Sequence, residues 1–129
     1  MNKFEANLIE ASRAELAITE LLKRQGYNAW LNPKKNGDCD VYFISDRQYG
    51  VEVKTDFASM YTGNVAIEPQ TLEHTKADYF AFVIPEVQFI ATADVRNFYT
   101  DYMQTGKNGG DQNKRLALIP KDILLNRKD

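Results

Sequence analysis

Two strand-like runs joined by a short polar turn most constrain how this chain folds. Residues 40–44 (DVYFI) are rich in aromatic and β-branched side chains, and residues 49–55 (YGVEVKT) follow after the polar stretch 45–48. A hairpin is the simplest connection between them. Because strand side chains alternate between the two sides of a sheet, Glu52 and Lys54 share one face. The same pairing is expected to bring Asp40 close to Glu52.

A long helix is expected before the hairpin. Asn2 with Glu5 resembles a helix-capping pair, and Gly26 is a natural stop. The apolar side chains between them recur at helical spacing on one stripe, formed by Phe4, Leu8, Ala11, Ile18 and Leu22. Glu15 fills the one gap in that stripe, which predicts a carboxylate on the core-facing side. The alternative is a carboxylate at the helix edge that reaches solvent by bending around its neighbours.

The remaining segments alternate between strands and helices. Further strands are expected at residues 28–31, 64–68, 78–84, 87–91 and 116–119. Helical segments are expected at residues 69–76 and 93–103 and after Pro120, with a Gly- and Asn-rich loop over 105–115. The order favours an α/β or α+β fold with a central mixed β-sheet flanked by helices. A chain of 129 residues suits a single domain, residues 1–129.

Composition excludes several chemistries. Cys39 and His74 are each the only residue of their type, which excludes an internal disulfide and zinc sites built on several cysteines or histidines. A metal would be held by carboxylate and backbone oxygens, which suits Mg²⁺ or Mn²⁺. Sixteen basic and eighteen acidic residues give a net charge of −2, which disfavours strong non-specific duplex binding.

Location and membrane contact follow from hydropathy along the chain. No apolar run approaches the ~18 residues of a membrane-spanning helix. The first fifteen residues carry acids where a signal peptide would be apolar. We therefore expect a cytoplasmic protein without a membrane partner.

The expected neighbours Asp40 and Glu52 point to metal chemistry. Two carboxylates at adjoining strand positions repel each other unless a cation lies between them. A divalent metal would resolve that repulsion, lower the pKa of a water and neutralise charge on a phosphate. Lys54 is a candidate for orienting the water or stabilising the transition state, and Glu15 for an outer ligand of the metal.

These residues resemble the motif of the PD-(D/E)XK nuclease superfamily, which includes restriction enzymes, Holliday-junction resolvases and RecB-type nucleases. Glu15 matches the helical acid, Asp40 the first acid, Glu52 the second acid and Lys54 the lysine. The resemblance implies a restriction-endonuclease-like core and Mg²⁺-dependent hydrolysis of DNA, rather than RNA, to 5′-phosphate and 3′-hydroxyl ends. No proline precedes the first acid, and Asp38 is an alternative for that position.

The resemblance also suggests a role in DNA repair or recombination. Residues 52–56 and 62–68 are similar to a phage or bacterial branch of the superfamily, in which Glu68 or Gln70 would reach the metal site. A chain of this size that cuts two strands would act as a homodimer. Two other functions stay open: a catalytically inactive nucleic-acid-binding module of the same fold, and a protein-interaction domain.

Several side chains are candidates for binding nucleic acid. Phosphates could be bound by Lys34, Lys35, Lys107, Lys114 and Arg115, for which the alternative is solvated loop charge. Nucleobases could stack on Tyr42, Tyr49 and Tyr61, for which the alternative is packing against the sheet.

Overall fold

A mixed five-stranded sheet forms the centre of the protein. The computed structural model describes residues 3–33, 39–55, 64–83, 87–105, 115–120 and 123. The sheet has the order β1-β2-β3-β5-β6, with parallel pairing between β3 and β5 and antiparallel pairing elsewhere. The strands are β1 (Asn28–Leu31), β2 (Val41–Ile44), β3 (Gln48–Thr55), β5 (Tyr79–Val83) and β6 (Val87–Ala91). The predicted α/β architecture with a central mixed sheet is therefore confirmed.

The hairpin expected from the sequence forms between β2 and β3. Val41 lies opposite Val51, and Tyr42 lies opposite Gly50. The strand expected around residues 78–84 is also present as β5, where Phe80, Ala81 and Phe82 are completely buried. Burial on both faces explains why this strand is almost uniformly apolar.

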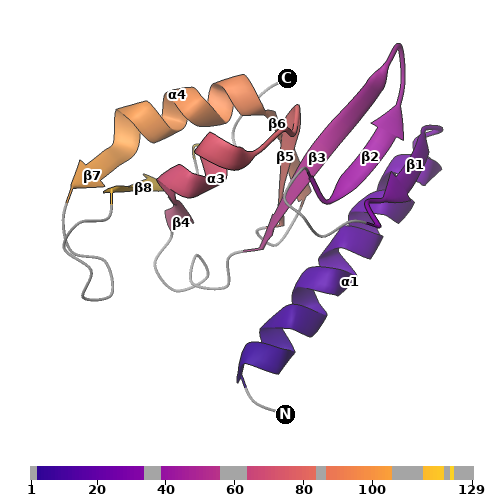
Figure 1. Ribbon diagram of the computed structural model, residues 1–129, viewed down its shortest axis with the longest axis horizontal. Coiled ribbons are helices and arrows are strands. Elements are labelled where there is room, and N and C mark those ends of the chain that lie inside the picture. Colours follow the sequence, from indigo (N-terminus) through magenta and orange to yellow (C-terminus); the bar gives the residue numbers. More distant parts are fainter. Residues whose placement is uncertain are drawn as a thin grey trace.

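Helices α1, α3 and α4 accompany the central sheet in the described part of the chain. α1 (Lys3–Arg24) packs against β1, β2 and β3, and α4 (Thr92–Tyr102) packs against β5, β6 and β8. The short α3 (Pro69–His74) lies with α4 at the other end of the molecule from α1 (Figure 1). Gly26 ends α1 with a φ of 96°, the left-handed conformation that favours glycine. In the part of the chain that is described, no helix is long and apolar enough to cross a membrane.

A second, three-stranded sheet was not expected from the sequence. It has the order β4-β8-β7 and consists of β4 (Asn64–Ile67), β7 (Met103–Thr105) and β8 (Arg115–Pro120). The predicted helix over 93–103 ends at Tyr102, and Met103 instead pairs with Ala117. Pro120, expected to open a helix, is the last residue of β8 and lies opposite Asn64. These pairings join distant segments, so local sequence patterns do not reveal them.

The two faces of the central sheet belong to different hydrophobic cores. On one face, Val41 and Val51 pack with Ile18 of α1. On the other face, Phe80 and Phe82 pack with residues of α4, β4 and β8. Glu52 pairs with Phe80 and Lys54 with Phe82, so these two polar side chains lie on the face opposite α1.

Gly50 is closely packed beneath the side chain of Cys39. A Cβ atom at residue 50 would lie 2.6 Å from the Cys39 Sγ atom, and Cys39 is buried. We expect Gly50→Ala to lower the free energy of unfolding by about 1–3 kcal/mol, because buried side chains cannot move aside without strain. Urea unfolding measures this cost.

The reason for that cost is tested with a double-mutant cycle. In a Cys39→Ala background the nearest obstacle is removed, so Gly50→Ala should then have little effect on the free energy of unfolding. An equal cost in both backgrounds would contradict the contact with Cys39 as its cause.

Candidate metal and catalytic site

Hydrogen bonds to its backbone and its side chain hold Asp40 in place at the start of β2. Its backbone N–H donates to the Val51 carbonyl at 2.9 Å, and its carbonyl accepts from the Asn32 N–H at 2.9 Å. The Asp40 Oδ2 atom accepts from the Val53 N–H at 2.8 Å. The Asn32 side-chain amide fixes the preceding residue by donating to the Cys39 carbonyl at 2.7 Å. The carboxylate of Asp40 is thereby anchored between β2 and β3.

The side chain of Glu52 contacts both Asp40 and Thr75. Burial, the hydrogen bond with Asp40 and the negative charge of Asp40 raise the pKa of Glu52 to about 8. Lys54 and a hydrogen bond with Thr75 oppose that rise in pKa. The two carboxyl groups therefore share one small space, which favours either a proton on Glu52 or a cation between them.

Lys54 lies two residues beyond Glu52 on the same face of β3. Its side chain is half-buried, and its charge acts to lower the pKa of Glu52. Two carboxyl groups thus lie together at one end of the β2–β3 hairpin, and the positive charge of Lys54 is close enough to act on one of them. Oxygen ligands of this kind suit Mg²⁺ or Mn²⁺, and the nearby positive charge suits an anionic substrate.

Thr75 and Asp78 support this arrangement and were not identified from the sequence. The Thr75 backbone N–H donates to the Thr71 carbonyl at 3.2 Å at the end of α3, which places its side chain beside Glu52. Asp78 accepts from the Gly50 N–H at 2.9 Å and forms an ion pair with Arg47 at 3.1 Å. Burial alone would raise the pKa of Asp78, but these two partners lower it below its ordinary value.

Asp78 also fixes how β3 and β5 are aligned. Its backbone N–H donates to the Gly50 carbonyl at 2.8 Å, so Gly50 is bonded to both the backbone and the side chain of Asp78. This double contact lies two residues before Glu52 on the same strand. These contacts join segments that are distant in the sequence. A single aspartate before an apolar strand therefore gives no local pattern from which they could be predicted.

Glu15 occupies a different position from the other three predicted residues. It is half-buried on α1, which covers the opposite face of the sheet from Glu52 and Lys54. The Thr19 hydroxyl donates to the Glu15 backbone carbonyl at 2.9 Å. Within the described ranges, no three His, Cys, Asp or Glu side chains gather as a metal-binding group. The role of Glu15 as an outer ligand stays a prediction.

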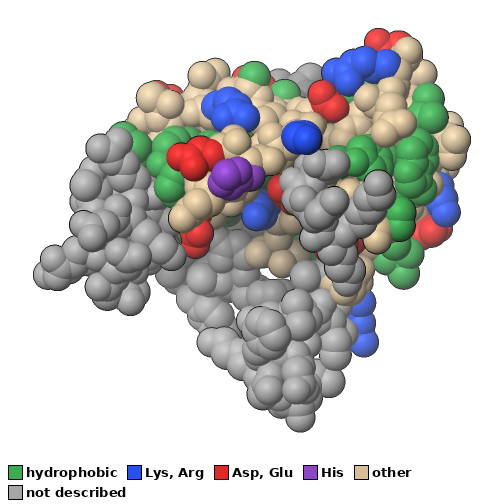
Figure 2. All heavy atoms as spheres, in the orientation of Figure 1, with side chains coloured by type: hydrophobic (Ala, Val, Ile, Leu, Met, Phe, Trp, Pro, Cys, Tyr) green, Lys and Arg blue, Asp and Glu red, His purple; other side chains and the backbone are tan. Residues whose placement is uncertain are grey.

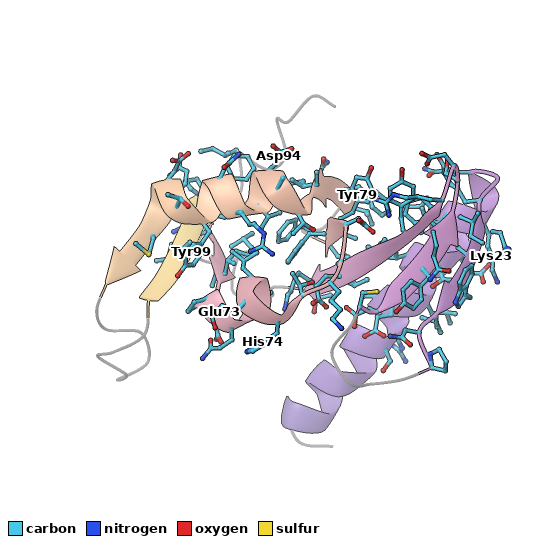
Figure 3. All side chains as sticks on the ribbon, turned by 45° about the horizontal axis from the view of Figure 1, so that its top comes forward. Lys23, Glu73, His74, Tyr79, Asp94 and Tyr99 are labelled. Carbon is cyan, nitrogen blue, oxygen red and sulfur yellow. The ribbon has the colours of Figure 1, made fainter. Side chains whose placement is uncertain are left out.

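The remaining candidates are dispersed. Glu68 is exposed immediately before α3, and Gln70 is exposed within it. Arg115 begins β8, opposite Thr105. His74 is exposed on α3 and projects away from the central sheet (Figure 3). The other predicted residues lie outside the described ranges: Lys34, Lys35, Asp38, Tyr61, Lys107 and Lys114.

The fold is similar to those of two DNA nucleases. A bacterial homing endonuclease aligns with 16% identity and a TM-score of 0.53, over 65% of this chain and 64% of that chain. This chain thus spans slightly less than two thirds of the length of the homing endonuclease. Hjc, a Holliday junction resolvase from the archaeal hyperthermophile Archaeoglobus fulgidus, aligns with 13% identity and a TM-score of 0.54 over 90% of this chain and 88% of that chain. This chain therefore shares the restriction-endonuclease-like fold of the two structures. No protein-family model and no curated protein sequence matches the chain.

The raised pKa of Glu52 predicts a specific pH dependence of stability in EDTA. The folded state holds the Glu52 proton more tightly than the unfolded state, whose carboxyl has an ordinary pKa of 4.5. This stabilisation is complete below pH 4.5 and is lost as pH rises through about 8. Glu52→Gln cannot titrate, so its free energy of unfolding should increase relative to wild type across that window. Urea unfolding at several pH values measures the difference, and a constant difference would contradict the prediction.

Proposed function

We propose that this protein is a metal-dependent nuclease that hydrolyses DNA phosphodiester bonds. The observation that supports this most strongly is the contact between Asp40 and Glu52, with Lys54 on the same strand face as Glu52. The two neighbouring folds belong to a homing endonuclease and a Holliday junction resolvase, which makes DNA the favoured substrate. We include a role in recombination or repair, and a homodimer for cutting two strands, in the same proposal.

The residues present fit a divalent cation. Asp40 and Glu52 supply hard oxygen ligands, and the crowding that raises the pKa of Glu52 would be relieved by a positive charge between them. The Val53 N–H holds Asp40, and Thr75 holds Glu52, so both carboxylates are oriented before any ligand binds. A bound Mg²⁺ would lower the pKa of a water molecule and neutralise charge on the phosphate.

The chain's own residues would then carry the remaining steps. Lys54 would hold the attacking water and stabilise the negative charge that develops on the phosphate oxygens. Attack of the water oxygen on phosphorus breaks the bond to the 3′ oxygen, and the products are a 5′-phosphate and a 3′-hydroxyl. Asp78 contributes indirectly, because it holds Gly50 and thereby the strand that carries Glu52, and Arg47 in turn holds Asp78.

Cleavage assays test the proposal with residue-matched controls. Wild type should cut DNA in Mg²⁺ or Mn²⁺ and not in EDTA. Lys54→Ala and Glu52→Gln should each lower the cleavage rate by about 100-fold or more, because each removes a group that stabilises the transition state. Lys23→Ala and Glu73→Gln remove the same groups at exposed positions on α1 and α3 and should leave the rate unchanged (Figure 3).

The substrate panel contains single-stranded, duplex and branched DNA, each labelled at one end so that the cut position is visible. Retention of DNA without cutting in both Mg²⁺ and Mn²⁺ would contradict the nuclease and favour a binding module. Equal losses in the Lys54→Ala and Lys23→Ala variants would show that Lys54 has no special role.

A further inference from the structure

An aromatic surface lies beside the candidate site on the same side of the central sheet. Trp30, Tyr42 and Gly50 are cross-strand neighbours on β1, β2 and β3. The rings of Trp30 and Tyr42 have centroids 5.9 Å apart and an interplanar angle of 33°. Tyr42 follows Asp40 by two residues, and Gly50 precedes Glu52 by two residues, so the surface is about 7 Å along the strands from the two carboxylates.

This part of the sheet is not covered by a second layer among the described residues. α1 packs on the other face, where Phe43 and Tyr49 lie, and α4 packs mainly on β5, β6 and β8. Trp30 and Tyr42 are only half-buried, and Ile44 retains 41% of its surface exposed. Figure 2 shows hydrophobic side chains gathered over β1 and β2. Aromatic rings left at a surface in this way are suited to contact a flat partner.

A hollow lies beside Tyr42. It has a volume of about 200 Å³ and is lined by Cys39, Tyr42, Gln48, Gly50, Lys76 and Asp78. A side-chain hydrogen bond between Tyr42 and Cys39 fixes the aromatic ring at the edge of the hollow. The hollow is smaller than the roughly 300–1,000 Å³ of sites for drug-sized ligands, which suits one planar group.

We propose that Tyr42, Trp30 and the adjoining hollow bind one unpaired base of the DNA substrate next to the cleaved phosphate. The base would stack on the Tyr42 and Trp30 rings, and the polar groups of Gln48 and Asp78 would meet its edge. Lys76, also in the wall of the hollow, supplies positive charge for the attached backbone. The inference rests on the proposed nuclease function and narrows its substrate to DNA that is bulged, branched or otherwise locally unpaired.

Tyr49 shows why Tyr42 is the residue selected. Tyr49 lies on the opposite face, where its ring stacks on Phe43 at 5.2 Å and is covered by the Arg47 guanidinium at 4.0 Å. Its hydroxyl also donates to Asp46 at 2.7 Å. Of the tyrosines considered for stacking on bases, only Tyr42 lies on the same face as Glu52 within the part of the chain that is described.

Fluorescence of Trp30 tests the inference directly, because it is the only tryptophan in the chain. Binding is measured with a paired duplex, the same duplex with a one-base bulge, and that bulge carrying an abasic site. Ca²⁺ replaces Mg²⁺, since it accepts the same oxygen ligands, and electrophoresis verifies that the DNA is intact. The base in the bulge should change Trp30 fluorescence and tighten binding about tenfold over the abasic bulge.

Matched substitutions identify the stacking residue. Tyr42→Leu should weaken binding of the bulged duplex about tenfold, whereas Trp30→Phe, which keeps a ring, should retain most of the affinity. Tyr27→Leu is the control, because Tyr27 is 37% exposed and packs against Phe43 on the other face. Equal losses for Tyr27→Leu and Tyr42→Leu, or identical wild-type binding to the bulged and abasic duplexes, would overturn the inference.

The wild-type comparison stands even if a variant fails to fold. Failure of the nuclease proposal has a different signature from failure of this inference. Stacking of the base without cutting in Mg²⁺ would contradict the proposed nuclease activity and support the base-binding surface. Cutting with no preference for the unpaired base would support the proposed nuclease activity and contradict the base-binding surface.

Discussion

The contact between the carboxyl groups of Asp40 and Glu52 is the constraint on which the site depends. Two acids placed together and partly removed from water repel each other, and the raised pKa of Glu52 reflects that cost. The surrounding structure maintains the contact, through the Val53 N–H on Asp40 and the Thr75 side chain on Glu52. An arrangement of charges that is unfavourable in itself and fixed by its surroundings is typical of a functional site.

One strand supplies both the core and the site because its side chains alternate. Val51 and Val53 face α1, whereas Glu52 and Lys54 face the other side of the sheet. Asp78 holds this strand against β5 with its backbone N–H and its carboxylate. A slip of one residue would move the valines away from α1 and the charged side chains into the core. The alignment of β3 thus determines stability and chemistry together.

Local features were predictable from the sequence, whereas contacts between distant segments were not. The β2–β3 hairpin and the sharing of one face by Glu52 and Lys54 follow from strand alternation within sixteen residues, 40–55. The β7–β8 pairing, and the contacts of Thr75 and Asp78, form between segments that no local pattern relates. The helical stripe placed Glu15 on α1, but the sheet face that α1 covers is set by tertiary packing. For the same reason the sequence offered Tyr42 and Tyr49 equally as residues that stack on bases. The structure places them on opposite faces of the sheet.

Line broadening by Mn²⁺ in amide NMR spectra tests most directly whether the Asp40–Glu52 pair binds a metal. Because a bound paramagnetic ion broadens nearby signals, the amides of Asp40, Val53 and Thr75 should disappear first as Mn²⁺ is added to wild type. The same amount of Mn²⁺ should leave these signals visible in Glu52→Gln. Broadening that begins at other acidic positions, such as Glu73 or Asp94, or that is unchanged by Glu52→Gln, would contradict the assignment of the metal to this pair.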